Sequence, residues 1–244
     1  MYFGRFCVFA CISSCYCSFE KDENSCGLLT KFLETSPVSL AINKYGFHRD
    51  VVITVELSPD ALSGFRVLLV QRWPRGIYVD PYQLASLRNQ GDWEILLDSS
   101  IDLEVPAHKT SGFVSYVYST PEEPTPSQLT VTIPVHGRYQ KPSCDEKTFT
   151  SVDIEPPELL LRRENCMQSD TVSPLTVVDA PCTPNNSSIC TWVKLQHHKD
   201  QGPVSLQFPV GDGSLVLSVC AGTLLVTMIC CLALSKYIWE HRVI

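Results

Sequence analysis

The sequence predicts an all-β, sandwich-like domain followed by a single C-terminal transmembrane α-helix. One uncharged apolar run, Leu215–Ser235, lies near the C-terminus. Upstream of it, short stretches rich in β-branched and aromatic residues recur between turn-forming residues, and helical periodicity is scarce. The 17 prolines and 12 glycines also favour a loop-rich β domain over a helical one.

The run Leu215–Ser235 has the length of a membrane span. As a helix rising about 1.5 Å per residue it would be roughly 31 Å long, which matches the hydrocarbon core of a bilayer. A buried helix of a soluble protein, the alternative, would normally carry a polar stripe, whereas Ser and Thr are scattered here. Asp212 precedes the run, and Lys236 and Arg242 follow it. The positive-inside rule therefore assigns residues 236–244 to a short cytosolic tail and the preceding chain to the lumenal or extracellular side.

A hydrophobic C-terminal run also occurs in signals for attachment of a glycosylphosphatidylinositol (GPI) anchor, which are removed from the mature protein. In this chain charged residues follow the run, and Tyr237 and Trp239 stand where interfacial aromatic residues are expected. The sequence therefore favours a span that is retained.

The first residues have the pattern of a secretory signal peptide. Arg5 supplies the positive charge, Phe6–Tyr16 is an apolar run too short to span a bilayer, and small residues around Ser13–Ser18 offer a cleavage site. We expect a signal peptide over residues 1–18, with the cut site open, and a β-rich lumenal domain over residues 19–214. A signal peptide together with the C-terminal span gives a single-pass type I topology.

Cysteine usage divides by compartment. Of the 12 cysteines, those in or beside the signal or inside the span are set aside, which leaves Cys26, Cys144, Cys166, Cys182 and Cys190 for the domain. Cys182 and Cys190 bracket a loop rich in Pro and Asn, and they are the pair that we expect to be disulfide-bonded. The odd number leaves one cysteine free, paired with another chain, or paired with a retained Cys17. No C-x-x-C spacing is present, which argues against zinc and redox sites.

Strand-like segments follow one another at short intervals through the domain. A short helix is also expected over Tyr82–Asn89, because Pro81 suits a first helical position. The size class is that of an immunoglobulin domain, but the Cys…Trp…Cys spacing of such domains is not evident. The predicted strands are Val51–Leu57, Phe65–Gln71, Trp93–Leu97, Ile101–Val105, Phe113–Tyr118, Leu129–Val135, Leu159–Leu161, Thr176–Val178, Ile189–Leu195 and Val204–Phe208.

No motif in the chain predicts catalysis or a cofactor. The G-x-S-x-G, P-loop, H-E-x-x-H and G-x-G-x-x-G patterns are absent. The pairs Asp102/Glu104 and Asp153/Glu155 have the spacing of metal-holding acidic pairs in some glycosyltransferases, but on a strand this spacing is more simply a solvated face. The formal net charge of −7, without a basic cluster, argues against nucleic-acid binding. We expect no cofactor and no small-molecule substrate of the chain's own.

The stretch Asn185-Asn186-Ser187-Ser188 contains two overlapping N-glycosylation acceptors, Asn185 and Asn186. Both lie in a loop of a domain already assigned to the lumen, where such acceptors are modified. We expect at least one of them to carry a glycan, and the sequence leaves open which.

Two further stretches stand out. The first is Gly76-x-Tyr78-Val79-Asp80-Pro81-Tyr82-x-Leu84, in which Pro81 restricts Asp80 to extended geometry and two tyrosines flank the corner. The second is Pro134-Val135-His136-x-Arg138-Tyr139-x-x-Pro142, where a proline inside a strand indicates an edge strand and a cationic, aromatic cluster follows. From the residues alone, a buried tyrosine corner beside a solvated Arg138 is as good an interpretation as a binding surface.

These two motifs, in this order, resemble the PIG-X family, whose members are type I membrane proteins of the endoplasmic reticulum. The similarity runs from about Leu28 to the membrane span. One departure is Gln83, which stands where the family pattern leads us to expect an acidic residue. The resemblance implies a non-catalytic subunit that binds and stabilises PIG-M, the multi-spanning catalytic subunit of GPI mannosyltransferase I. That enzyme adds the first mannose, from dolichol-phosphate mannose, to the glucosaminyl-phosphatidylinositol precursor.

The resemblance also makes seven residues candidates for the partner surface or, equally, for holding the fold. A cell-surface receptor or adhesion ectodomain is the alternative class, because it shares the signal, the sandwich and the single span. An enzyme with an unrecognised lumenal site is a third. The seven candidate residues are Tyr78, Asp80, Pro81, Tyr82, His136, Arg138 and Tyr139.

Overall fold

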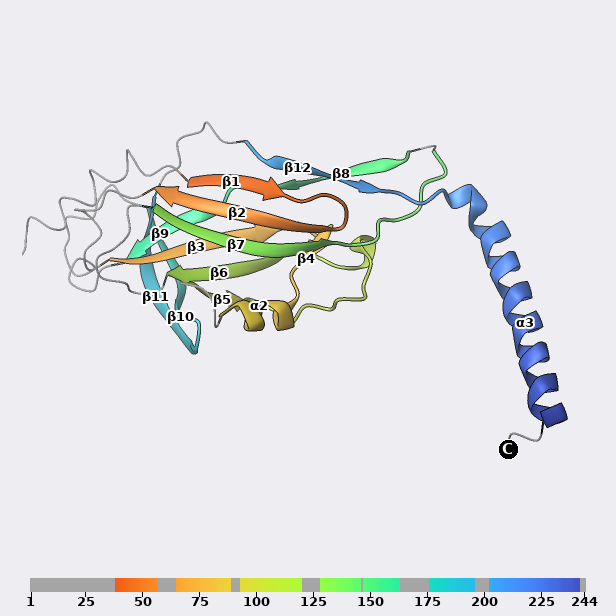
Figure 1. The fold of residues 1–244 in the computed structure, drawn as a ribbon. Helices are drawn as coiled ribbons and strands as arrows, with labels where there is room; N and C mark the ends of the chain where they lie inside the picture. The colour runs from red at the N-terminus through yellow and green to blue at the C-terminus, as the bar shows by residue number, and fades with distance from the viewer. Residues whose placement is uncertain are drawn as a thin grey trace, which may run out of the picture.

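The computed structural model describes residues 38–56, 65–88, 93–119, 128–145, 147–162, 176–195 and 202–241. Within these ranges the chain forms a β-rich domain followed by one long apolar helix, which confirms the predicted fold class (Figure 1). The expected signal peptide over residues 1–18 lies outside the described residues.

The strands form two facing antiparallel sheets and a smaller two-stranded one. The order in the first sheet is β1-β2-β7-β4, in the second β10-β11-β9-β3-β6-β5, and the pair is β12-β8. The bounds are β1 Val38–Asn43, β2 His48–Glu56, β3 Arg66–Trp73, β4 Ile77–Tyr78, β5 Trp93–Leu97, β6 Phe113–Ser119, β7 Gln128–Gly137, β8 Phe149–Ile154, β9 Glu158–Arg162, β10 Thr176–Thr183, β11 Asn186–Lys194 and β12 Val204–Pro209.

The main core lies between the two sheets. Along β2 the side chains of Val51, Ile53 and Val55 are fully buried, and along β7 alternate residues such as Ile133 and Val135 point to the same interior. This alternation follows from the period of two along a strand. The sandwich is therefore held by apolar side chains that the sequence pattern already showed.

The central strand β3 is buried on both of its faces. Its inner face belongs to the main core, and on its outer face Leu68 and Val70 pack in a second cluster with Trp192 of β11 and Ala180 of β10. The β10–β11 hairpin thus covers the outer face of the second sheet. This double burial explains why Val67–Val70 of β3 is a continuous apolar run instead of an alternating pattern.

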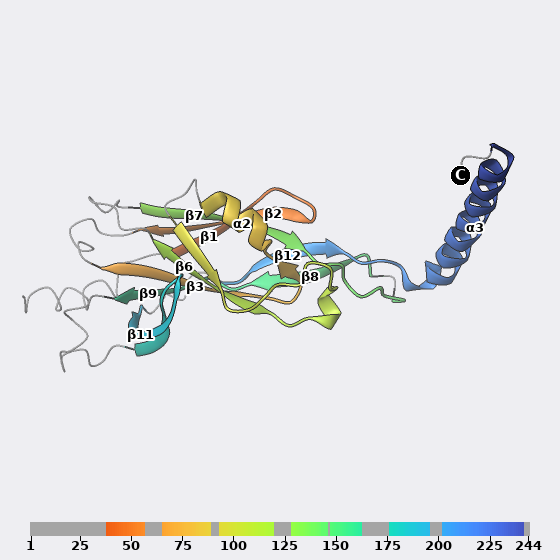
Figure 2. The ribbon, with the colours of Figure 1, turned by 90° about the horizontal axis from the view of Figure 1, so that it is seen from below.

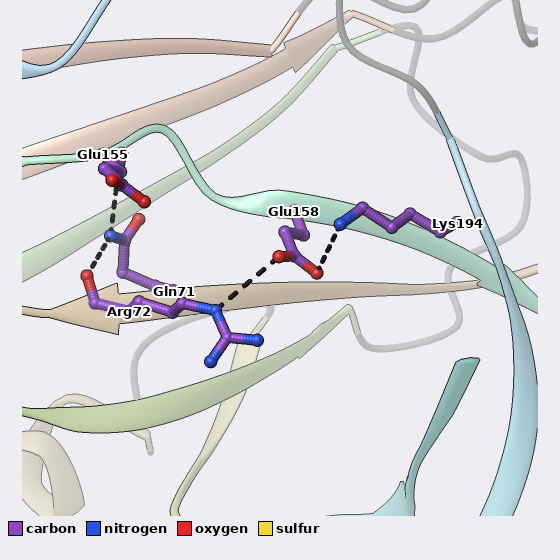
Figure 3. A network of polar contacts seen from close by, with 5 residues as sticks. All are labelled: Gln71, Arg72, Glu155, Glu158 and Lys194. Carbon is purple, nitrogen blue, oxygen red and sulfur yellow. Dashed lines mark hydrogen bonds and ion pairs between the residues drawn. The ribbon is translucent and has the colours of Figure 1, made fainter. Parts of the chain in front are cut away.

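A polar network ties β3 to β9 and β11 (Figure 3). Gln71, fully buried on β3, donates from Nε2 to the carbonyl oxygens of Arg72 at 2.9 Å and Glu155 at 3.0 Å. Glu158 forms ion pairs with Arg72, at 3.6 Å, and with Lys194, at 3.1 Å. Because Arg72 is largely exposed, its ion pair contributes little, and the buried Gln71 contacts are the stronger constraint.

The segment 101–105 is not the strand that the sequence predicts. It runs as bends without ladder pairing, and the Asp102 carboxylate accepts from the backbone N–H of Glu104 at 3.0 Å. Such a local Asp turn competes with strand pairing. The chain then enters the 3₁₀ helix η2, Ala107–Lys109.

The sequence predicts an edge strand at Pro134, but this is wrong for β7, which lies between β2 and β4. One side of β7 pairs with β2 along its length, with Pro134 opposite Asp50. On the other side β4 pairs only at His136 and Gly137. The missing N–H of Pro134 therefore costs no ladder bond.

The helix α3, Val216–His241, follows a short 3₁₀ turn η5, Gly213–Leu215, and none of its residues is buried. It is long and apolar enough to cross a membrane, so the alternative of a buried core helix is wrong and a single-pass membrane protein fits. The hydroxyls of Thr223 and Thr227 bond to carbonyl oxygens of the preceding turn, so these polar groups are satisfied within the helix. The helix continues beyond Ser235 into the expected tail.

The linker to α3 is pinned to the domain. The N–H of Ser143 donates to Gly211 at 3.0 Å, and the N–H of Gly213 donates to Ser143 at 2.8 Å. The β1–β2 turn, β4, η2 and the C-terminal end of β7 all lie at the end of the domain from which α3 departs (Figures 1 and 2). We call this the membrane-proximal end.

Cys182 on β10 and Cys190 on β11 form a disulfide that closes their hairpin, with Cα atoms 5.0 Å apart. This is the disulfide pair predicted from the sequence. Cys144, close to the linker, is an exposed free thiol.

Candidate functional site

The two sequence motifs meet at the membrane-proximal end. The pairing of β4 with β7 sets Tyr78 opposite His136, and their rings stack with centroids 5.0 Å apart and planes at 19°. The guanidinium of Arg138 lies 4.9 Å from the centroid of the Tyr78 ring. Residues from motifs some 60 positions apart in the sequence therefore form one cluster, which we call the inner cluster: Tyr78, His136 and Arg138.

His136 is held by contacts from three elements. Its Nε2 lies 2.9 Å from Oε1 of Gln83, and its ring meets that of His48 edge-on at 4.6 Å. Its Nδ1 is buried without a hydrogen-bond partner among the described residues. Burial lowers the pKa of His136, the nearby His48 lowers it further, and Asp80 opposes both. The arrangement favours a neutral imidazole.

Arg138 is buried, with 4% of its surface exposed, so the expectation of a solvated side chain is wrong. Its Nη1 donates to the carbonyl oxygen of Val105 at 2.6 Å and so fixes the loop that precedes η2. Burial lowers the pKa of Arg138, against the opposing effects of Tyr78 and Asp102. This arginine acts inside the domain, where it joins β7, β4 and the loop.

Asp80 and Pro81 have a local role in starting the helix α2, Pro81–Arg88, which confirms the predicted helix and its first position. The Asp80 carboxylate accepts from the backbone N–H of Tyr82 at 2.8 Å, and its carbonyl accepts from Leu84 at 3.0 Å. Asp80 is therefore the N-cap of α2. The cap orients α2 so that Gln83 reaches His136.

Tyr82 and Tyr139 differ from the other candidates because they are exposed, by 81% and 78% respectively. The centroid of the Tyr139 ring lies 5.6 Å from that of Phe47, a partly buried residue that packs against the main core. We call these two the outer tyrosines. The structure thus separates residues that hold the fold from residues that are available for contact with another molecule.

The comparison with protein families agrees with the motifs. The family model described as PIG-X / PBN1 matches residues 44–239, which include both motifs and nearly all of α3. The chain belongs to the PIG-X family.

Three mammalian proteins are similar to this family member over most of its length. A human protein named GPI alpha-1,4-mannosyltransferase I, stabilizing subunit, is 33% identical over 190 residues, which cover 77% of this chain and 73% of the human one. The proteins of the same name from rat and mouse are each 31% identical over 201 residues, covering 80% of this chain and 79% of theirs.

Several residues of this PIG-X site were not singled out from the sequence. Phe47 comes from the β1–β2 turn and His48 from the start of β2, and Val105 contributes only a backbone oxygen. His48 lies three positions before the β-branched run that begins at Val51, but no sequence signal gives the register that sets it opposite His136. Within the described ranges, no three His, Cys, Asp or Glu side chains gather as metal ligands.

Gly137 gives a first testable prediction for this family member. A Cβ built on Gly137 would lie 2.6 Å from Cδ1 of the fully buried Phe208 and closer still to Cε1. Gly137→Ala is therefore expected to lower the free energy of unfolding by about 1–3 kcal/mol through overpacking. Gly211→Ala is the matched control, because its Cβ would meet nothing within 4 Å. Thermal unfolding of both variants in mild detergent measures the difference, and equal melting temperatures would contradict it.

His136 gives a second prediction, on pH. Its folded-state pKa is lowered, whereas the unfolded chain titrates near the ordinary value of about 6.5. The contribution of neutral His136 to the free energy of unfolding is therefore complete above about pH 6.5. It is lost as the pH falls from there toward the lowered pKa of the folded state, because the unfolded state then binds more protons. Melting temperatures measured down to about pH 5 should show a shallower slope for His136→Gln than for the exposed control His108→Gln. Parallel slopes for the wild type, His136→Gln and His108→Gln would rule out His136 as the titrating group.

Proposed function

We propose that this member of the PIG-X family is the non-catalytic subunit that binds and stabilises PIG-M, the multi-spanning mannosyltransferase that adds the first mannose to the GPI precursor from dolichol-phosphate mannose. The observation that carries the proposal is the similarity to relatives named as the stabilizing subunit, which extends over 77–80% of the chain. The family model matches residues 44–239, which include β2 to β12 and most of α3.

We place the protein in the endoplasmic reticulum membrane with the sandwich in the lumen. Lys236 lies near the C-terminal end of α3, and Asp212 lies before its start, which supports a cytosolic C-terminus. Protease added to sealed microsomes should trim only the tail. Glycans sensitive to endoglycosidase H support residence in the endoplasmic reticulum, and resistant glycans would support the alternative of a cell-surface ectodomain.

The outer tyrosines are the proposed partner contact. Four positions separate Tyr139 from Ser143, which is bonded to the linker of α3. An extended chain spans at most about 3.6 Å per residue, so Tyr139 lies within about 15 Å of the linker. Lumenal loops of a multi-spanning partner beside α3 would meet this end of the domain. Exposed tyrosines are effective interface anchors, because they bring large apolar area and a polar tip at low entropic cost.

The test is genetic complementation. Cells that lack this protein should display less GPI-anchored protein on their surface and contain less PIG-M, and re-expression should restore both. Normal display in the null cells would overturn the proposal. Mannose transfer by the purified chain alone, without PIG-M, would instead support a lumenal enzyme.

A further inference from the structure

A cavity of about 360 Å³ lies at the other end of the domain, away from α3. It is formed by the beginnings of β3 and β5, the end of β6 and the β10–β11 turn, and more of its wall is apolar than polar. Figure 1 shows these segments on the side of the sandwich opposite the membrane helix. Phe65 and Tyr118 contribute aromatic rings to the wall, and Arg66 and Glu94 contribute charged groups.

Asn185 is part of this wall and also one of the two sequon asparagines. Pro184 and Asn185 form the turn of the β10–β11 hairpin, and Asn185 is exposed. The next residue, Asn186, is already paired with Thr183 in the ladder. Because a glycan needs a surface turn, the fold favours Asn185 over Asn186.

The hairpin presents Asn185 in a fixed position. The Cys182–Cys190 disulfide closes the hairpin just before the turn, with Cα atoms 5.0 Å apart. On the opposite wall, Tyr118 donates its hydroxyl to the carbonyl oxygen of Pro181 at 2.9 Å, which fixes the ring. Contacts within the protein therefore hold both sides of the cavity in place.

We propose that Asn185 carries an N-linked glycan and that its first N-acetylglucosamine packs into this cavity, an inference that rests on the lumenal orientation proposed above. The volume falls at the lower end of the range of about 300–1,000 Å³ that small-molecule sites occupy, which suits one or two sugar rings. The apolar face of the sugar packs on the aromatic wall, and its hydroxyl and amide groups face the charged rim.

The covalent step uses a polyprenyl-diphosphate oligosaccharide as co-reactant. Nδ2 of Asn185 forms a bond to C1 of the first sugar, and the bond between C1 and the diphosphate oxygen breaks. The diphosphate leaves with the electron pair, and the nitrogen gives up one proton to a base of the transferring enzyme.

Two single substitutions separate the acceptors. Ser187→Ala removes the sequon of Asn185 and keeps that of Asn186, whereas Ser188→Ala does the reverse. In full-length protein made in cells, peptide N-glycosidase F should shift the electrophoretic mobility of the wild type and of Ser188→Ala, but not of Ser187→Ala. The inverse pattern, or no shift in any of the three, would overturn the assignment.

Two glycosidases then test whether the sugar occupies the cavity. Endoglycosidase H leaves one N-acetylglucosamine on Asn185. Peptide N-glycosidase F removes the whole glycan and converts Asn185 to Asp, whereas Ser187→Ala gives a sugar-free chain that keeps Asn185. We expect the single-sugar form to have the same melting temperature as the intact glycoprotein. The sugar-free form and Ser187→Ala should both have melting temperatures about 3 °C lower. If the single-sugar form melts with the sugar-free form, the first sugar does not pack in the cavity.

The outcome is separable from that of the proposed function. Because the cavity and the outer tyrosines lie at opposite ends of the domain, Ser187→Ala should leave the level of PIG-M unchanged. Absence of a glycan in cells with normal PIG-M overturns this inference alone. Unchanged PIG-M in null cells, with Asn185 glycosylated in the wild type, overturns the proposed function alone.

Discussion

Arg138→Ala is expected to lower the free energy of unfolding by about 2–4 kcal/mol. The substitution leaves the Val105 carbonyl without its donor and removes the side chain that lies over the Tyr78 ring. An orphaned buried acceptor costs about 1–3 kcal/mol, and a desolvated cation–π contact is worth up to about 2 kcal/mol. Part of this loss is offset, because the substitution also removes a charge whose pKa burial already lowers.

Thermal unfolding of the full chain in mild detergent measures the effect. For a chain of this size the melting temperature should fall by about 5–10 °C. Arg138→Met keeps most of the side-chain volume and should lose about half as much. Lys141→Ala removes the same charge from an exposed position and serves as the control. A melting temperature of Arg138→Ala equal to that of Lys141→Ala would contradict a structural role for Arg138.

The sheet-forming segments could be predicted because their burial follows a simple period. In β2 and β7 alternate residues enter the core, and Val67–Val70 of β3 is a continuous apolar run because both faces of the strand are covered there. The exception, 101–105, has the same alternation, but the Asp102 carboxylate closes a turn and the strand does not form. An alternating pattern does not reveal which hydrogen bonds compete with the ladder.

The site could be predicted as a set of residues but not as an arrangement. The two motifs contain the side chains that meet at the membrane-proximal end, yet the separation into inner cluster and outer tyrosines depends on the register of β4 against β7. The prediction that Arg138 is solvated was wrong for a similar reason. Its guanidinium donates to the backbone carbonyl oxygen of Val105, and the identity of an apolar residue does not indicate that its carbonyl will be such an acceptor. The register between distant strands and the choice of backbone acceptors cannot be predicted from the local sequence.

Replacing both outer tyrosines, Tyr82→Ser with Tyr139→Ser, is expected to weaken binding of the proposed partner PIG-M at least tenfold while the domain stays folded. Surface substitutions usually change stability by no more than about 0.5 kcal/mol, so the melting temperature should stay within about 2 °C of the wild type. A buried tyrosine anchor contributes about 2 kcal/mol or more at an interface, and about 1.4 kcal/mol already corresponds to a tenfold change in affinity.

Affinity capture from gently solubilised membranes compares the amount of PIG-M recovered with the double variant and with Ile189→Ser. Ile189 is 62% exposed on β11, in the hairpin that covers the outer face of the second sheet, so the control removes a comparable apolar contact elsewhere. Loss of PIG-M with a preserved melting temperature identifies a contact surface, whereas the Arg138→Ala variant should lose PIG-M only together with its own stability. If the double variant retains PIG-M in full, the membrane-proximal end contributes to the fold alone, and the partner must bind elsewhere, along α3 or the sheet faces.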